Sequence, residues 1–77
     1  MMTCLIVDDE PLAQDVIEHH LGKIDFLSLK GKCSNAFEAL VKINSEQIDV
    51  LFLDIKMPEM SGIEFIKSIK QVAKIIL

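Results

Sequence analysis

Two short apolar runs that lead directly into aspartates constrain the fold of this chain most. Residues 50–53 read Val-Leu-Phe-Leu and precede Asp54, and residues 3–7 read Thr-Cys-Leu-Ile-Val and precede Asp8 and Asp9. A short apolar run bounded by turn signals is typical of a buried strand in a parallel sheet. We therefore expect two strands that deliver acids to the carboxyl edge of one sheet, where open α/β folds bind ligands.

The segments around these runs alternate between helical and strand periodicity. We predict strands over residues 3–7, 26–33 and 49–54, helices over residues 11–22, 35–44 and 62–72, and the start of a fourth strand over residues 74–77. Alternation of this kind indicates an α/β fold, with a parallel sheet and helices on both of its faces. The whole chain then forms one domain.

Local patterns refine three of these elements. Residues 11–22 follow an acidic loop, so Asp9 or Glu10 is predicted to cap a helix that starts at Pro11. The apolar stripe of this helix is predicted to include Leu12, Val16, Ile17, His20, Leu21 and Ile24.

In residues 26–33, Leu27, Leu29 and Cys33 share one parity while Ser28, Lys30 and Lys32 share the other. This alternation predicts a strand at the edge of the sheet or on a partly exposed face. The next helix is predicted to begin with a capping box formed by Asn35 and Glu38.

Composition narrows the classes of function. The chain has 77 residues, of which 51% are hydrophobic and 26% charged, an ordinary globular composition. Its net charge of -4 comes without a cluster of lysine or arginine, so we expect no nucleic-acid-binding surface on this chain. Cys4 and Cys33 lie in strand-like runs without CxxC spacing, which predicts buried, reduced thiols rather than a disulfide or metal site. No segment resembles a membrane span or signal peptide, so a cytoplasmic location is expected.

The acids at the two strand ends suggest a chemistry. If the two strands are neighbours, Asp8, Asp9 and Asp54 converge, and their mutual repulsion favours binding of a cation. Oxygen ligands suit Mg²⁺ or Mn²⁺ rather than zinc. A carboxylate beside Mg²⁺ can attack a phosphoryl group and form an aspartyl phosphate. The alternative is that each acid only ends a strand or caps a helix.

These motifs resemble the receiver domain of two-component response regulators. The matching segments are Leu-Ile-Val-Asp-Asp-Glu-Pro at residues 5–11, Leu-Phe-Leu-Asp-Ile-Lys-Met-Pro at residues 51–58, and Ser-Gly at residues 61–62. The resemblance implies a flavodoxin-like sheet with strand order 2-1-3-4 in the part present. The run Asp-Asp-Glu-Pro-Leu-Ala is similar to regulators that carry a LytTR-type DNA-binding domain.

The resemblance also implies residue roles. Asp54 is the expected phosphoacceptor, and the expected Mg²⁺ ligands are Asp8, Asp9, Asp54 and the backbone carbonyl of Lys56. The loop would be shaped by Met57, Pro58 and Gly62. The expected phosphoryl donor is a histidine kinase or a small acyl phosphate, and the expected output of the whole protein is control of transcription.

One departure from the family pattern bears on the switch. The family's Ser or Thr after strand four and Lys at the end of strand five have no counterpart up to Leu77. We therefore expect a partial receiver domain that keeps its nucleophile and metal ligands and does not complete the switch. An exposed sheet edge is also expected to favour self-association, with exchange of residues 75–77 as one route.

Two other functions compete with the phosphoacceptor. A Mg²⁺-dependent phosphatase with an aspartyl nucleophile would have a second Asp two residues after the first, where this chain has Lys56. A receiver used only for docking would not need all three acids. We therefore expect a signalling domain that is phosphorylated itself rather than a turnover enzyme.

Overall fold

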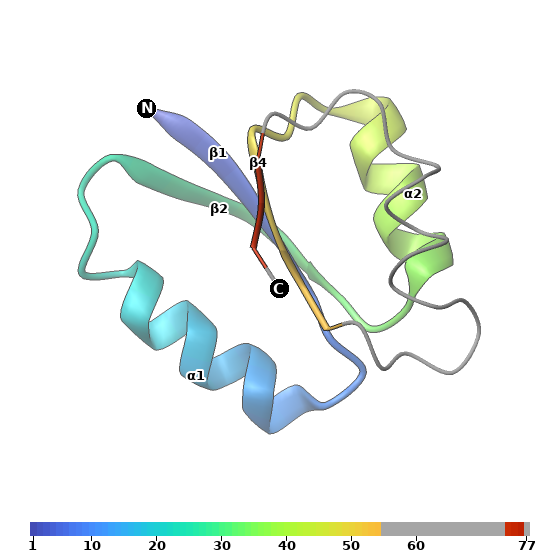
Figure 1. Ribbon diagram of the computed structural model, residues 1–77, viewed down its shortest axis with the longest axis horizontal. Helices are drawn as coiled ribbons and strands as arrows, with labels where there is room; N and C mark the ends of the chain where they lie inside the picture. Colours follow the sequence, from blue (N-terminus) through green and yellow to red (C-terminus); the bar gives the residue numbers. More distant parts are fainter. Residues whose placement is uncertain (55–73, 77) are drawn as a thin grey trace.

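In the part of the chain that the structure describes, a four-stranded parallel sheet carries one helix on each face (Figure 1). The computed structural model describes residues 1–54 and 74–76. Its elements are β1 (Met2–Val7), α1 (Pro11–Leu21), β2 (Leu27–Cys33), α2 (Ala36–Ser45), β3 (Val50–Leu53) and β4 (Lys74–Ile76). The strands lie in the order β2-β1-β3-β4, which confirms the predicted parallel sheet and its order.

The observed elements end within a residue or two of the predicted bounds. The first helix ends at Leu21 instead of residue 22, because Gly22 is its C-cap and donates its N–H to the Glu18 carbonyl. The third strand is shorter than residues 49–54, although Asp49 and Asp54 each donate one backbone N–H to β1. The helix predicted over residues 62–72 lies outside the described residues.

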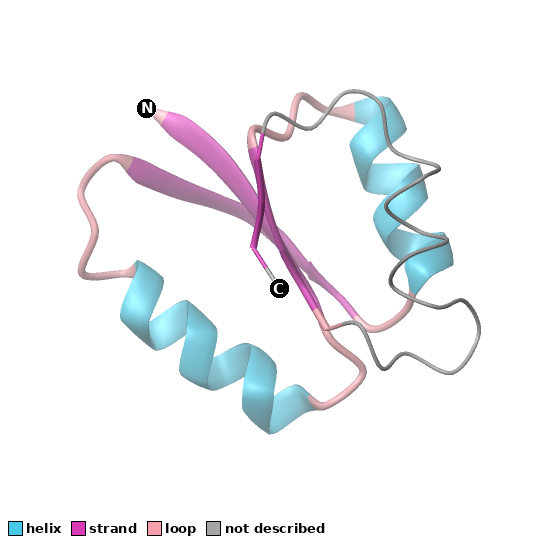
Figure 2. Cartoon of the chain, viewed as in Figure 1, coloured by secondary structure: helices cyan, strands magenta, loops and turns pink. Residues whose placement is uncertain are grey.

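The two faces of the sheet hold separate hydrophobic clusters, and α1 and α2 lie on opposite sides of it (Figure 2). In β1, Leu5 and Val7 belong to the cluster that α2 covers, while Cys4 and Ile6 belong to the one that α1 covers. All four side chains are fully buried. Burial on both faces explains why β1 reads as an unbroken apolar run.

A bulge in β2 corrects the predicted parity of that strand. Cys4 pairs with Leu29 and Leu5 pairs with Gly31, so Lys30 is an extra residue without a partner in β1. Leu29 therefore packs on the α1 side while Cys33 packs on the α2 side, not on one face as predicted. The extra residue reverses the alternation at that point.

The buried face of α1 also differs from the predicted stripe. Leu12 and Val16 are 72% and 57% exposed, so their predicted burial was wrong. Gln14 and Leu21 are buried instead, and Ile17 is partly buried against the hydrophobic cluster on the α1 side of the sheet. The helix is turned so that the row of residues 14, 17 and 21 faces the sheet, and the hydrogen bonds of Gln14 described below favour this rotation.

The cap of α2 follows the predicted pattern. Asn35 Oδ1 accepts a hydrogen bond from the Glu38 N–H at 2.8 Å, and Glu38 Oε1 accepts one from the Ser34 N–H at 2.8 Å. The side chain of Glu38 thus reaches one residue further back than in the usual capping box. These bonds fix where β2 ends and α2 begins.

The two cysteines are buried free thiols, as predicted, and they lie on opposite faces of the sheet. Burial raises the pKa of Cys33 to about 11 and also raises the pKa of Cys4. Both thiols are therefore protonated at neutral pH, and neither is an activated nucleophile.

Two surface properties complete the fold. Among the described residues, no helix has the length and apolar character needed to cross a membrane.

In the described sheet β3 lies between β1 and β4, so the edges are β2 and β4. Self-association through an exposed sheet edge stays a prediction.

Candidate functional site

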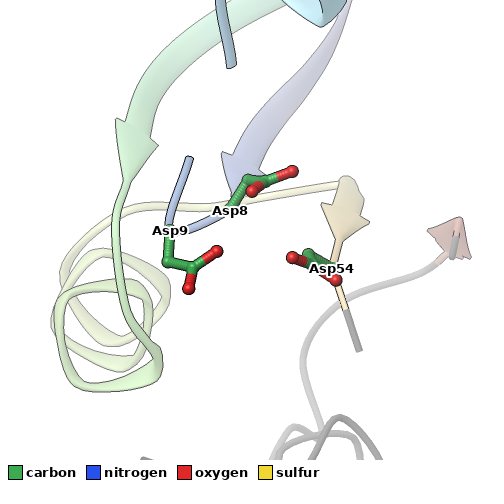
Figure 3. A group of neighbouring side chains, drawn as sticks. All are labelled: Asp8, Asp9 and Asp54. Atoms are coloured by element: carbon green, nitrogen blue, oxygen red, sulfur yellow. The ribbon is translucent and has the colours of Figure 1, made fainter. Parts of the chain in front are cut away.

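Three aspartates meet at the carboxyl edge of the sheet, next to the ends of β1 and β3. Asp8 and Asp9 follow β1 directly, and Asp54 follows β3 (Figure 3). One carboxylate oxygen from each residue lies within 4.8 Å of the other two. Asp8 and Asp54 are partly buried and Asp9 is exposed. The convergence predicted from the sequence is therefore present.

Backbone hydrogen bonds that continue the ladders of the sheet place these acids. The Asp54 N–H donates to the Val7 carbonyl at 2.9 Å, and the Asp8 N–H donates to the Cys33 carbonyl at 2.9 Å. Asp8 and Asp54 are thus each anchored through the peptide group to a neighbouring strand. The pairing of β1 with β3 makes Asp8 and Asp54 neighbours, because equivalent ends of parallel strands share one edge.

The turn between β1 and α1 corrects the predicted helix cap. Glu10 occupies the cap position of α1, but its side chain makes no capping hydrogen bond. Instead Asp8 Oδ1 accepts a hydrogen bond from the Glu10 N–H at 2.9 Å. This bond closes a tight turn that carries Asp9 between its two ends.

An open pocket of about 420 Å³ lies beside the acids at the carboxyl edge of the sheet. Its carboxylates come from Asp8 and Asp54, and its remaining described walls are apolar. The pocket is lined by Val7, Asp8, Ile17, Phe52, Leu53, Asp54 and Ile76. A small anionic group attached near Asp54 would therefore have an apolar wall on one side and the acids on the other.

The donor set of the cluster fits a hard divalent cation. All three side chains are carboxylates, and no histidine or cysteine belongs to the group. Such oxygen ligands at a partly exposed site match the preferences of Mg²⁺, which keeps several water ligands. The mutual repulsion of three carboxylates gives a physical reason for a cation to bind there.

The predicted roles of Lys56, Met57, Pro58 and Gly62 fall on residues outside those that the structure describes. They remain predictions from the family resemblance.

Gln14 is a residue of this site that reading the sequence missed. Its side-chain Nε2 donates to the Asp8 carbonyl at 2.6 Å and to the Cys33 carbonyl at 3.0 Å. A signal was present, since Gln14 lies three and seven residues before the apolar Ile17 and Leu21 and so shares their helix face. A polar residue on such a face indicates a buried hydrogen-bonding role.

The comparison with protein families decides the class of this chain. Residues 4–77 match the family described as the response regulator receiver domain. The chain belongs to this family. Receiver domains are signalling modules rather than turnover enzymes, so the family match confirms the resemblance and favours the signalling function over the phosphatase.

Curated relatives of the chain are response regulators. An uncharacterized response regulatory protein of Shewanella oneidensis is 47% identical over 66 residues, which cover 86% of this chain and 28% of that protein. The transcriptional regulatory protein BtsR is 46% identical in Salmonella typhi and 44% identical in Escherichia coli K12, with the same coverage. This receiver chain thus spans 28% of the length of these relatives.

Solved structures share the fold. The MaeR response regulator bound to beryllium trifluoride superposes with a TM-score of 0.92 at 29% identity, over 100% of this chain and 66% of that one. An RcsB–DNA complex superposes with a TM-score of 0.81 at 26% identity, over 87% of this chain and 35% of that one. The receiver fold of this chain is therefore the arrangement found in these response regulators.

Proposed function

We propose that this receiver domain accepts a phosphoryl group on Asp54, with Mg²⁺ held by the neighbouring acids. The observation that carries the proposal is the approach of Asp8, Asp9 and Asp54 to within 4.8 Å at the carboxyl edge of a receiver-family sheet. Beryllium trifluoride, described as phosphomimetic for RcsB, is present in structures similar to this chain, including that of MaeR.

The chemistry assigns separate tasks to the acids. An Asp54 carboxylate oxygen attacks the phosphorus of a phosphohistidine, the new O–P bond forms as the P–N bond breaks, and the imidazole nitrogen retains the electron pair and takes up a proton. Asp8, Asp9, Asp54 and the Lys56 backbone carbonyl are the proposed ligands of Mg²⁺. When bound, the ion neutralises charge on the phosphoryl oxygens. We assign loop-shaping roles to Met57, Pro58 and Gly62.

The proposed donor is a histidine kinase, and a small acyl phosphate is the chemical substitute for it. BtsR is named as a transcriptional regulatory protein and is similar over this segment. We therefore propose that the receiver controls transcription through an output domain of the LytTR type. A docking-only receiver is the competing function, and it differs by requiring no phosphorylation of Asp54.

Intact-mass measurement after incubation with Mg²⁺ and acetyl phosphate tests the proposal. We expect one added phosphoryl group on the wild-type chain and a loss of at least about 100-fold in Asp54→Asn, because the nucleophile is removed. Asp49→Asn is the matched control, since Asp49 is an acid at the opposite edge of the sheet. It should be phosphorylated as the wild type is.

Two results would contradict this assignment. A phosphoryl group that persists in Asp54→Asn would place the acceptor elsewhere. Complete absence of an adduct on the wild-type chain, with Mg²⁺ bound, would favour a receiver that acts only by docking.

A further inference from the structure

Gln14 is the one buried polar side chain among the described residues, and it lies under the acidic cluster. It is 8% exposed. Its amide nitrogen uses both of its hydrogens, one toward the Asp8 carbonyl at 2.6 Å and one toward the Cys33 carbonyl at 3.0 Å. A single side chain thus joins α1 to the carboxyl ends of β1 and β2.

The orientation of this amide follows from its neighbours. Both groups that face the nitrogen are backbone carbonyls, which can only accept hydrogen bonds. A flipped amide would place its own oxygen against two carbonyl oxygens, so the assigned orientation is the one that satisfies the site. The same geometry excludes an ionised carboxylate at this position.

The bonds of Gln14 belong to a closed network around the turn that carries the acids. The Gln14 N–H donates to the Glu10 carbonyl at 3.1 Å, and the Glu10 N–H donates to Asp8 Oδ1 at 2.9 Å. The Asp8 peptide is held on both sides, because its N–H donates to the Cys33 carbonyl and its own carbonyl accepts from Gln14. Asp9 lies inside this network, between two anchored residues.

We propose that Gln14 is a positioning residue, which holds the turn so that Asp8 and Asp9 stay beside Asp54 before any cation binds. Three carboxylates with oxygens within 4.8 Å repel one another, and a turn free to relax would separate them. Binding of a cation would then require the turn to be ordered again, and affinity would fall. The inference rests on the proposed function in that it assumes a divalent cation at the acidic cluster.

The test compares Mn²⁺ binding, measured by electron paramagnetic resonance, in the wild-type chain and Gln14→Met. Methionine keeps the length of the side chain and removes both donors. We expect Mn²⁺ affinity to fall about 10-fold, as is common when a partner outside the ligand shell is lost. The Mg²⁺ concentration for half-maximal phosphorylation by acetyl phosphate should rise by a similar factor, while the rate at saturating Mg²⁺ changes less.

A readout without metal separates positioning from general stability. Hydrogen exchange of the Asp9 and Glu10 amides should be faster in metal-free Gln14→Met, while the amides of α2 keep their wild-type rates. Leu21→Val is the control, because Leu21 is buried on the same face of α1 at its other end. It should lower the melting temperature and leave Mn²⁺ affinity unchanged.

If Gln14→Met does not fold, Gln14→Asn is measured in its place. Its amide is one methylene shorter and can reach only one of the two carbonyls, so Mn²⁺ affinity should fall about 3-fold. Folded Gln14 variants with wild-type Mn²⁺ affinity and wild-type exchange at Asp9 and Glu10 would overturn the positioning role, even if Asp54 is phosphorylated. Weaker Mn²⁺ binding together with no adduct on wild-type Asp54 would support positioning and refute the phosphoacceptor instead.

Discussion

Carboxylates at the two ends of the sheet have different surroundings. At the amino end, Asp49 Oδ2 accepts hydrogen bonds from the Thr3 N–H at 2.9 Å and the Thr3 hydroxyl at 3.2 Å, and Asp49 Oδ1 accepts one from Gln47 at 3.3 Å. At the carboxyl end, Asp8, Asp9 and Asp54 bring their oxygens within 4.8 Å of one another. One end surrounds an acid with donors, and the other gathers acids together.

This difference separates stability from function. The Thr3 backbone N–H and then the Gln47 side chain lower the pKa of Asp49, because hydrogen bonds favour the charged form. The fold thus gains from Asp49 as an anion. The cluster at the carboxyl end concentrates three carboxylates at one place, which is the pattern expected where a site is kept ready for a cation.

The bulge in β2 divides this strand into two halves, one toward the amino end of the sheet and one toward its carboxyl end. Residues before Lys30 pair with the amino-terminal half of β1, and residues after it pair with the half that leads to the acids. The register at the site is therefore set after the bulge. This arrangement yields the prediction with the largest effect.

Deleting Lys30 should be tolerated, whereas deleting Lys32 should be strongly destabilising. Without Lys30, Leu29 and Gly31 pair with Cys4 and Leu5 in regular alternation, and every other side chain keeps its face. Without Lys32, either Lys30 enters the α2-side core or Cys33 leaves it, at a cost of about 3 kcal/mol or more. Thermal unfolding followed by circular dichroism measures both variants.

The two deletions are matched, since each removes one lysine from the same strand. Lys32 also forms ion pairs with Asp15 and Glu18, but these are on the surface and contribute little. Equal losses of melting temperature in the two variants would mean that the bulge does not set the register.

Mg²⁺ should stabilise the folded chain only by binding to the acidic cluster at the carboxyl end of the sheet. At a free concentration ten times its Kd, a ligand specific for the folded state adds about 1.4 kcal/mol, or about 6–11 °C in melting temperature for a domain of this size. Asp9→Asn and Asp54→Asn should lose most of this shift. Differential scanning fluorimetry with Mg²⁺ and with a chelator measures it.

Asp49→Asn is the control at the other end, and it should keep the full Mg²⁺ shift. A shift that survives in Asp9→Asn and Asp54→Asn would show that the ion binds away from the acidic cluster.

Neutralising one acid at each end should change stability in opposite directions in the absence of metal. Asp9→Asn relieves repulsion and should raise the melting temperature by about 3 °C at low salt, corresponding to about 0.5 kcal/mol. Asp49→Asn removes an anion that the fold favours and should lower it at pH 7. Melting curves in a chelator, at low and high salt, measure both signs.

The effect of Asp49 should also depend on pH. Its pKa in the folded chain lies below the ordinary value of 3.8, so its contribution is complete above that value and is lost as the pH falls through the folded pKa. The gap between wild type and Asp49→Asn should therefore narrow only below about pH 4. If the difference in stability between wild type and Asp49→Asn is constant from pH 7 to pH 3, the effect of the substitution comes from packing and not from the charge of Asp49.

The two central strands illustrate what could be predicted from the sequence. The apolar runs of β1 and β3 indicate burial on both faces, and the acid after each run follows from reading the chain. The alternation of elements and the family resemblance together predict the parallel order. Asp8, Asp9 and Asp54 could thus be selected as a cluster because parallel strands bring equivalent ends to one edge.

Other features could not be predicted from local patterns. Leu12 and Val16 satisfy helical spacing as well as Ile17 and Leu21 do, so periodicity alone does not fix which row faces the sheet. The hydrogen bonds of Gln14 to two strand ends favour the observed rotation, and one of these partners, Cys33, is 19 residues away in sequence. Parity within residues 26–33 likewise assigns Cys33 to the wrong face, because pairing with β1 leaves Lys30 as an extra residue.

The sequence by itself determined the strands, the helices and the acids that follow them, since these depend on short-range periodicity and on residue type. Only the tertiary structure decided the rotation of α1, the bulge in β2 and the hydrogen-bonded turn that holds Asp8. The physical reason is that the position of a buried amide, or of an unpaired residue in a strand, depends on contacts with residues of other elements. Local sequence defines the groups that need partners, and packing chooses those partners.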